Sequence, residues 1–552
     1  MCELIRITEL SLPLGDPSRE ETRLALRRAI ARRLNITDDD LIDFVVYKRS
    51  HDARRKDSGI SFVYIVDVDV RDEPGVLLQH SDDRQISPSP DTRFIPPPRA
   101  ADGLHERPVV VGFGPCGLFA ALVLAQQGYR PIVLERGRDV RRRTQDTWAL
   151  WRRRNLDAES NVQFGEGGAG LFSDGKLYSQ IKDPRFLGRQ VMREFVRAGA
   201  PPEIMYVNKP HIGTFRLTGV VSRLREEIIA LGGDIFFEHK VTDLMIENDA
   251  AGARQITGVV LANGEVFASR HVVLALGHSS RDTVRMLEQR KVFMEAKPFA
   301  IGFRIEHPQS MIDRARLGRF AGHSDIGAAD YKLVHHARNG RSVYSFCMCP
   351  GGTVVAATSE VGHVVTNGMS QYSRNERNAN AGIVVGVDPL RDYPGGPLAG
   401  ITLQESLERQ AFLLGGEDYS APGQLVGDFI AGRASTNFGE VEPSYKPGVK
   451  LTDLSSLLPK EAIEAIREAL PVFGRQIRGF DRDDAVLTGI ESRTSSPVRI
   501  TRDDRTLQSL NVRGLYPGGE GAGYAGGILS AGVDGIKLAE AVALQLSGRE
   551  AA

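Results

Sequence analysis

The chain has 552 residues, which is long enough for two to four domains. Its hydrophobic fraction of 41% and charged fraction of 25% are those of a soluble globular protein. Lys+Arg and Asp+Glu are both 70, so the composition gives no electrostatic sign of a nucleic-acid or membrane partner, and four cysteines are too few for a disulfide scaffold.

The first 95 residues are predicted to form a small α+β domain. Strand patterns at 4–10, 44–48 and 61–70 and a helical pattern at 19–34 give the order β-α-β-β. No basic segment followed by an apolar one stands at the N-terminus, so we expect no signal peptide and a cytoplasmic protein.

A basic run and a proline-rich segment mark the end of this domain. The run Lys48–Lys56 could bind an anionic partner, but a solvated hairpin is the favoured interpretation because the chain has no overall basic bias. Prolines cluster between residues 85 and 107 and predict an extended linker, which we assign to 96–107.

The rest of the chain is organised around the stretch Val109–Gly117. Its three valines predict a buried parallel strand, and the glycines that follow have G-x-G-x-x-G spacing. Gly112 permits a tight turn, Gly114 lets the backbone approach a pyrophosphate, and Gly117 lets the helix predicted at 118–127 pack against the strand. The N-terminus of that helix attracts phosphate groups.

A second strand at 131–134 ends at Glu135, about 20 residues beyond the first glycine of the motif. A carboxylate at that position can accept both ribose hydroxyls of an adenosine, so the segment is predicted to bind a dinucleotide. The uncharged run 109–125 could alternatively be a short transmembrane span. Its glycines, its proline and its depth in the chain argue against that alternative.

A glycine-rich loop at 164–177 follows a basic helix predicted at 138–154. Five glycines within eleven residues exclude a stable helix or strand interior, and they allow a flat ring or a phosphate to lie against the backbone. Ser173, Asp174 and Lys176 add polar groups to the loop. A plain surface loop is the alternative.

The following elements complete a dinucleotide-binding unit over 108–290. A helix is predicted at 217–231, strands follow on both sides of a hairpin turn at Asn263-Gly264, and a buried strand at 271–276 leads to Gly277. A βαβ unit, a hairpin and a returning strand are typical of an α/β flavoprotein fold.

Residues 291–431 are predicted to form an inserted, mostly antiparallel β domain that binds the substrate. Its most unusual segment contains Cys347 and Cys349 at C-x-C spacing. The thiols could be redox-active, or one could be a thiolate. Burial as small apolar residues on one strand face is the favoured alternative, because a disulfide would close a strained ring and a metal site would lack further ligands.

The second part of the dinucleotide-binding domain is predicted over 432–552. A helix is expected at 459–470. The polar segment 489–499 could line a pocket in which Arg493 binds an acidic substrate group, although a solvated loop explains it equally well. The last motif, 514–528, places Glu520 at a strand end and opens a helix that runs to about Leu546.

Together these segments resemble an FAD-dependent oxidoreductase of the glutathione-reductase-like superfamily. The resemblance is closest to the bacterial family usually called uncharacterised FAD-dependent, or NAD(FAD)-utilising, dehydrogenases. It covers most of the chain, and the segments that carry it are 164–177, 346–352, 491–497 and 518–527. It implies an α/β fold with an FAD-binding Rossmann-like (glutathione-reductase-type) domain in two parts, the inserted mostly antiparallel β domain and the small N-terminal α+β domain.

FAD is therefore the expected cofactor, and the expected reaction is hydride transfer between flavin N5 and a small organic substrate. The residues expected to bind the cofactor are Gly112, Gly114, Pro115, Cys116, Gly117, Glu135, Arg136, Gly165, Gly167, Gly168, Ser173, Asp174, Gly175, Lys176, Val241, Gly277, Gly519, Glu520, Gly526, Gly527 and Ile528. The candidate catalytic residues are Cys347, Arg493 and His278.

Several partners and activities are not expected. No second G-x-G-x-x-G follows a strand, so NAD(P)H would bind only transiently at the flavin. The C-x-x-x-x-C pair of disulfide reductases is missing, and no metal, nucleic acid or membrane is expected to bind. The alternative function is a flavin-binding regulatory protein whose basic N-terminal domain binds a partner. A halogenase or hydroxylase would need a flavin-hydroperoxide step that no residue set requires.

Overall fold

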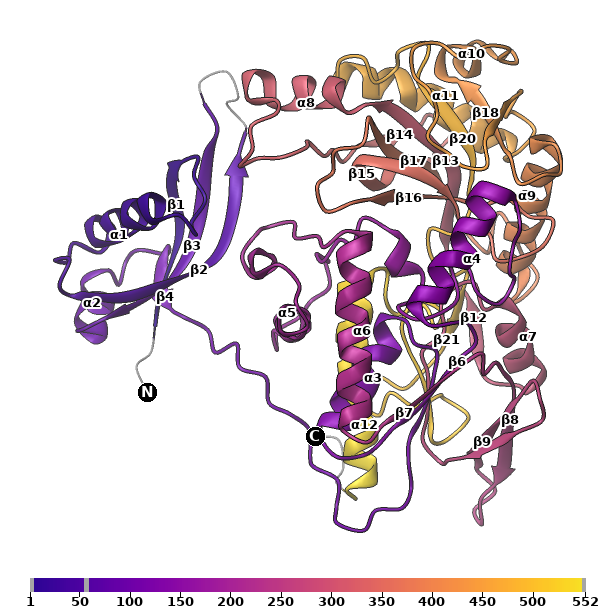
Figure 1. Cartoon of the computed structure of the whole chain (residues 1–552), viewed down its shortest axis with the longest axis horizontal. Coiled ribbons are helices and arrows are strands. Elements are labelled where there is room, and N and C mark those ends of the chain that lie inside the picture. Colours follow the sequence, from indigo (N-terminus) through magenta and orange to yellow (C-terminus); the bar gives the residue numbers. More distant parts are fainter. Residues whose placement is uncertain (1–3, 54–58, 549–552) are drawn as a thin grey trace.

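The computed structural model describes residues 4–53 and 59–548 and divides into three units (Figure 1). The N-terminal unit lies to one side and is joined to the rest by a long extended segment. A central unit is built on a parallel sheet, and a third unit is built on a large, mostly antiparallel sheet. The basic run Lys48–Lys56 falls partly outside the described residues, which omit 54–58.

The N-terminal unit has a ferredoxin-like order. Its elements are β1 (Ile5–Pro13), α1 (Glu20–Leu34), β2 (Leu41–Asp52), β3 (Ser61–Val70), α2 (Glu73–Gln79) and β4 (Ile86–Pro88). The antiparallel sheet runs β2-β3-β1-β4. Residues of β3 alternate between buried and half-buried, as the alternating sequence predicts, and the predicted α+β fold is confirmed.

The central unit begins with a Rossmann-like arrangement. Before the insertion its elements are β5 (Val109–Val111), α3 (Pro115–Gln126), β6 (Ile132–Glu135), α4 (Val140–Arg153), η1 (Ala169–Phe172), α5 (Leu187–Arg197), η2 (Pro202–Met205), α6 (Thr214–Ala230), β7 (Asp234–Phe237), β8 (Val241–Asn248), β9 (Arg254–Leu261), β10 (Val266–Ala268), β11 (Val272–Leu274) and α7 (Arg281–Gln289). The parallel sheet runs β22-β11-β5-β6-β7, and β22 (Leu515–Pro517) comes from the far end of the chain. The predicted α/β fold is therefore confirmed, and β8, β9 and β10 form the expected antiparallel hairpin sheet.

Helix α3 is buried on nearly every side, which explains its lack of charged residues. It packs against the parallel sheet and against α12 (Ile528–Leu546) and α6, which run beside it in Figure 1. The uncharged run 109–125 thus belongs to a protein core. None of the described helices is long and apolar enough to cross a membrane.

The inserted unit is larger than the sequence predicts. Its elements are β12 (Met294–Ala296), β13 (Phe299–Pro308), α8 (Gln309–Leu317), η3 (Gly318–Phe320), β14 (Val334–His336), β15 (Ser342–Ala356), β16 (Thr366–Ser370), β17 (Asn378–Val387), α9 (Ala399–Gly415), β18 (Ala421–Leu425), α10 (Val426–Ala431), β19 (Val449–Leu451), α11 (Lys460–Gln476) and β20 (Val486–Glu491). The sheet runs β14-β15-β17-β13-β20-β18-β19 with β16 beside β15, and every pair is antiparallel except β18 with β19.

The return to the central unit therefore lies beyond the predicted boundary at residue 431. Strand β20 pairs with both β13 and β18, so strands from both sides of residue 431 share one sheet. After β20, β21 (Val498–Ile500) pairs with β12 and carries the chain back towards β22 and α12. The two connections between the units thus lie side by side.

Candidate functional site

The crease after β5 has the geometry of a dinucleotide-binding turn. Gly112 has a φ of +98°, and a Cβ on Gly117 would lie 1.9 Å from the Gly112 carbonyl oxygen, so both positions require glycine. A Cβ on Gly114 would meet no described atom closer than the Gly168 Cα at 3.6 Å. No described side chain caps the first turn of α3, so its amide N–H groups are left for a ligand.

Glu135 organises this crease from the end of β6. Its Oε2 accepts a hydrogen bond from the Phe113 amide (2.8 Å), and its Oε1 accepts from the Gly137 and Gly165 amides (both 2.9 Å). A carboxylate has about four acceptor sites, so one remains for a ribose hydroxyl. Glu135 also has a role that the sequence did not predict, because it ties the crease to the glycine-rich loop.

The glycine-rich loop 164–177 is held by Arg143, which the sequence does not distinguish from its basic neighbours. The fully buried guanidinium of Arg143 donates to the carbonyl oxygens of Asn161 (2.8 Å), Val162 (2.7 Å) and Glu166 (2.6 Å). Burial lowers the pKa of Arg143 to about 10. The loop glycines with positive φ are Gly165, Gly167, Gly168 and Gly175. The loop is therefore a fixed backbone structure and not a plain surface loop.

A second glycine-rich turn packs against the start of α3. A Cβ on Gly519 would lie 2.9 Å from the Cβ of Cys116. Asp534 on α12 holds this turn, since its carboxylate accepts from the Gly519 amide (2.8 Å) and from Arg502 (2.6 Å). Cys116 is buried, and burial raises the pKa of its thiol, so Cys116 is a packing residue.

Bare backbone lines the carboxyl end of the parallel sheet. A Cβ on Gly277 or Gly527 would meet no described atom within 4 Å, and one on Gly526 would meet only a Glu520 carboxylate oxygen at 3.9 Å. Gly527 also precedes α12, which no described side chain caps. A flat cofactor with a diphosphate requires such exposed backbone and free N–H groups, so the residues present fit FAD.

Glu520 faces Lys297 where the central and inserted units meet. Burial raises the pKa of Glu520 to about 7, although Lys297 opposes this shift, and Oε1 accepts a hydrogen bond from the Ser496 amide at 3.2 Å. Burial lowers the pKa of Lys297, whose Nζ lies 3.4 Å from the Ser495 hydroxyl. A carboxyl group that titrates near neutral pH beside an ammonium can hold or release a proton.

The two thiols of the inserted unit lie in an irregular part of β15. The pairing of β15 with β17 shifts register on both sides of Cys349, and Cys347 has a φ of +44°, which is uncommon for a residue with a side chain. Cys349 is buried and Cys347 is partly exposed. The predicted regular strand, with both thiols buried on one face, is thus not what forms here.

Arg493 belongs to a buried network of ion pairs and hydrogen bonds, and the half-buried His278 lies close to it. The Arg493 guanidinium donates to Glu408 (2.8 and 3.0 Å) and to the hydroxyls of Ser279 and Ser359 (both 2.8 Å). Although burial alone would raise the pKa of Glu408, Arg281 and Arg493 hold it far below its usual range. Arg493 therefore closes an internal ion pair and does not project into a pocket.

His278 is neutral at physiological pH. Burial, together with the nearby cations Arg493 and Arg281, lowers its pKa to about 3. Its Nε2 has no partner among the described residues. A neutral imidazole keeps one N–H donor and one acceptor nitrogen, so His278 stays a candidate for hydrogen bonding to a ligand.

Other residues expected to bind the cofactor are bonded within the protein. Asp174 pairs with Arg374 (3.0 Å), and the Ser173 hydroxyl donates to the Gly170 carbonyl oxygen (2.7 Å). Two further residues of that set are Arg136, which pairs with Glu159 and Asp282, and Val241, which is buried at the start of β8. The polar side chains of Arg136, Ser173 and Asp174 therefore have partners within the protein.

An aromatic cavity of about 520 Å³ lies beside the glycine-rich loop. Its lining residues are Thr144, Trp148, Trp151, Arg152, Phe172, Thr214, Phe215, Thr218, Met369, Lys446 and Pro447. Thr214 donates to the Ser173 carbonyl oxygen (2.9 Å), which connects the cavity wall to the loop. The cavity combines aromatic rings with the exposed cations Arg152 and Lys446.

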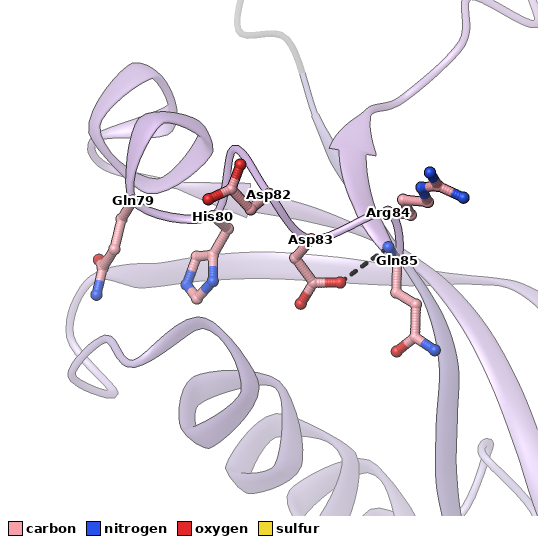
Figure 2. A pocket seen from close by; sticks show the side chains of 6 residues that line it. All are labelled: Gln79, His80, Asp82, Asp83, Arg84 and Gln85. Atoms are coloured by element: carbon pink, nitrogen blue, oxygen red, sulfur yellow. Dashed lines mark hydrogen bonds between the residues drawn. The ribbon is translucent and has the colours of Figure 1, made fainter.

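A second hollow, of about 480 Å³, lies in the N-terminal unit at the turn between α2 and β4. Figure 2 shows its lining, which comes from the short segment 79–85 alone. Asp83 accepts a hydrogen bond there from the Gln85 amide (2.9 Å). This polar turn is remote from the parallel sheet (Figure 1) and contributes nothing to the crease.

Comparison with known proteins places the chain in a family. The model of a family described as "FAD-dependent protein, C-terminal domain-like" matches residues 298–494, and a domain of unknown function matches residues 4–69. Among solved structures, glycine oxidase from Geobacillus kaustophilus is 12% identical, with 81% of this chain and 96% of that chain covered and a TM-score of 0.34. L-proline dehydrogenase from P. horikoshii is 12% identical, with 82% and 95% covered and a TM-score of 0.33.

An uncharacterised protein of Clostridium beijerinckii is 47% identical over 538 residues, which cover 97% of this chain and 98% of the relative. The match therefore includes all three units. The chain belongs to the same family as this Clostridium beijerinckii protein, and the match of residues 298–494 to a model described as an FAD-dependent protein supports FAD as the cofactor.

Proposed function

We propose that the chain is an FAD-dependent oxidoreductase of the glutathione-reductase-like superfamily that transfers a hydride between flavin N5 and a small organic substrate. The observation that carries the proposal is the bare backbone at Gly114, Gly277 and Gly527, where the protein leaves room for a flat dinucleotide. When bound, FAD supplies the two-electron chemistry at N5 of its isoalloxazine ring.

Different residues of the chain bind different parts of the cofactor. The N–H groups at the start of α3 bind the pyrophosphate, and Glu135 accepts a hydrogen bond from the adenosine ribose through its remaining acceptor site. The start of α12, preceded by Gly527, would favour negative charge on the part of FAD bound beside it.

Glu520, with Lys297 nearby, holds and releases protons at the boundary between the central and the inserted unit. Because the pKa of Glu520 is raised to about 7, its carboxyl group can hold or release a proton near neutral pH. The Lys297 ammonium faces it and favours the ionised carboxylate. Of the three candidate catalytic residues, Cys347 and His278 are partly exposed, whereas Arg493 is held in its ion pair with Glu408.

The aromatic cavity is the substrate site that we propose. Trp148, Trp151 and Phe172 offer flat apolar surfaces, while Arg152 and Lys446 supply positive charge. The fitting class of substrate is an apolar or aromatic molecule with an acidic group.

Anaerobic reduction of the purified protein tests this proposal. The protein should be yellow with one FAD per chain, and NADH, NADPH, or an aromatic amino or hydroxy acid should bleach the flavin absorption. A protein that stays colourless after incubation with FAD would contradict the whole proposal. If dithionite bleaches the flavin and none of these compounds does, hydride transfer from these classes is rejected. FAD binding would still stand in that case.

A further inference from the structure

The two thiols of the C-x-C segment are brought together by a bend in β15. In a flat strand, residues two apart have Cα atoms about 6.6 Å from each other, near the upper limit for a disulfide. Here the left-handed φ of Cys347 and the register shifts around Cys349 interrupt the strand, and the Cys349 thiol turns back to donate to the Cys347 carbonyl oxygen at 3.4 Å. The bend supplies the approach that a C-x-C pair otherwise lacks.

The charged groups around these thiols have one cation in excess. The cations are Lys176, Arg304 and Arg374, and the anions are Asp174 and Glu491. Arg374 binds Asp174 through two hydrogen bonds, and Arg304 binds Glu491 at 2.8 Å. The remaining cation is Lys176, which lies 3.5 Å from the Asp174 carboxylate that Arg374 already holds.

Lys176 compensates for charge on the sulfur atoms. Its ammonium donates to the carbonyl oxygen of Met348, the residue between the two cysteines. Although burial alone would lower the pKa of Lys176, the two thiols and Asp174 raise it. An ammonium confined beside two sulfur atoms stabilises a thiolate.

The two sulfur atoms are not equivalent. The interaction with Cys349, together with Lys176 and Arg304, lowers the pKa of Cys347 although burial opposes this, whereas the interaction with Cys347 and burial raise the pKa of Cys349. Cys347 is the partly exposed residue of the pair, and Cys349 is buried. An accessible thiolate beside a buried thiol is the arrangement of an attacking and a resolving sulfur.

The thiol pair is connected to the proposed flavin site through the glycine-rich loop. Lys176 and Asp174 belong to this loop, and Glu135 joins the same loop to the crease after β5 through the Gly165 amide. At Gly168 an added Cβ would lie 2.9 Å from the Gly114 Cα. One rigid segment therefore contacts both the crease and the cysteines.

We propose that Cys347 and Cys349 form a second redox centre, a dithiol–disulfide couple that exchanges two electrons with the FAD and serves a disulfide or dithiol substrate. In the oxidative direction the Cys347 thiolate and the Cys349 thiol form one S–S bond, and the S–H bond of Cys349 breaks. The two electrons and that proton convert FAD to FADH⁻. The ring closed by C-x-C spacing is strained, which makes the disulfide easy to reduce and suits a redox role better than a structural one.

This inference rests on the proposed function, and an anaerobic dithionite titration tests the two separately. The holoprotein is first treated with diamide, which oxidises paired thiols, and is then desalted. We expect the wild type to take up four electrons per FAD, two for the flavin and two for the disulfide. Cys349→Ser and Cys347→Ser should each take up two, and the control Cys2→Ser should take up four, since Cys2 is the cysteine farthest from the pair in the sequence.

Each other outcome contradicts a defined part of the inference. Uptake of two electrons by the diamide-treated wild type would overturn the second redox centre while leaving the flavin oxidoreductase intact, and this comparison does not depend on the variants folding. Uptake of four electrons by Cys349→Ser would overturn the pairing of the two thiols. A protein without FAD would instead overturn the proposed function.

Discussion

At the scale of single residues, the crease is held by buried charges that bind backbone groups. Glu135 accepts from three amides, and Arg143 donates to four carbonyl oxygens of the segment that carries the glycine-rich loop. Buried ionised groups are costly unless they are satisfied in this way. The positions of the bare glycines therefore depend on two side chains that need not touch the cofactor themselves.

Replacement of Glu135 by glutamine should loosen FAD and destabilise the fold. An amide has one acceptor oxygen, so at least one of the three backbone N–H groups would face an NH₂ group, at a cost of about 1–3 kcal/mol in unfolding free energy. We expect FAD affinity to fall at least about tenfold, by equilibrium dialysis, which corresponds to about 1.4 kcal/mol. The control is Glu159→Gln, a half-exposed ion-pair residue. Full FAD retention by Glu135→Gln would count against its role.

His307 should make stability depend on pH. Burial lowers its pKa to about 4; Nε2–H donates to the Phe480 carbonyl oxygen, and Arg482 and Asp484 are the nearby charges. The unfolded chain binds a proton below about pH 6.5 and the folded chain only near pH 4, so unfolding free energy falls as pH decreases between those values. The native protein should therefore lose stability on acidification through this group.

Urea unfolding at pH 7 and pH 5 isolates that contribution. In His307→Gln the loss of stability between the two pH values should be smaller than in the wild type by about 2 kcal/mol. The exposed His336, changed to glutamine, is the control and should leave the loss unchanged. Equal losses in wild type and His307→Gln would show that His307 does not titrate differently on folding.

At the scale of elements, two helical glycines have opposite roles. A Cβ on Gly117 in α3 would lie 1.9 Å from the Gly112 carbonyl oxygen, whereas one on Gly219 in α6 would meet no described atom within 4 Å. Gly117→Ala should cost about 1–3 kcal/mol or more by overpacking and should weaken FAD binding. Gly219→Ala should gain about 0.5–1 kcal/mol. Thermal unfolding of both variants checks this, and a Gly117→Ala protein as stable as the wild type would reject the close packing.

The ion-pair network of Glu408 joins three elements. Glu408 on α9 binds Arg281 on α7 and Arg493 after β20, and its side chain is fully buried. Glu408→Gln would leave two buried guanidinium groups with only the partly exposed Glu360 as a shared carboxylate, so we expect a loss of about 3–5 kcal/mol in urea unfolding. Glu464→Gln, in an exposed pair with Lys460, should change stability by about 0.5 kcal/mol or less. Similar losses in both variants would contradict the network's importance.

Elements whose sequence pattern lies within the element itself could be predicted from the sequence. The segment β5–α3–β6 carries its own strand, turn and helix pattern, and α3 begins three residues before its predicted start because Pro115 occupies its first turn. Strand β20 could not be assigned to the inserted sheet, since its pairing with β13 joins residues far apart in the chain. The bend at Cys347 could not be predicted either, because cysteine gives no local signal for a positive φ.

In the candidate site, too, residues with a local sequence signal could be predicted, and residues defined by distant contacts could not. The glycines of the crease were predicted because each serves a backbone geometry with a known spacing. Arg143, Lys297 and Asp534 were not, since what distinguishes them is burial against segments distant in sequence. Arg493 was misassigned for the same reason, because its partner Glu408 lies on another element.

At the scale of the whole molecule, the site is assembled from widely separated parts of the chain. The crease comes from β5 and α3, the loop from residues 164–177, and the second turn from residues 518–527 after the entire inserted unit. The inserted unit adds the thiols and Lys297 at the boundary. The chain leaves and re-enters the central unit through the paired strands β12 and β21, which keeps these parts in register.

The central claim is that FAD lies along the crease after β5, with its pyrophosphate against Gly114. Gly114 has a backbone conformation open to any L-residue, and an added Cβ meets no described atom within 3.6 Å, so Gly114→Val should fold normally. The decisive measurement is the FAD dissociation constant of Gly114→Val against the wild type. We expect it to rise at least about tenfold with unfolding free energy unchanged, which corresponds to about 1.4 kcal/mol. An unchanged dissociation constant in a folded Gly114→Val protein would contradict the claim.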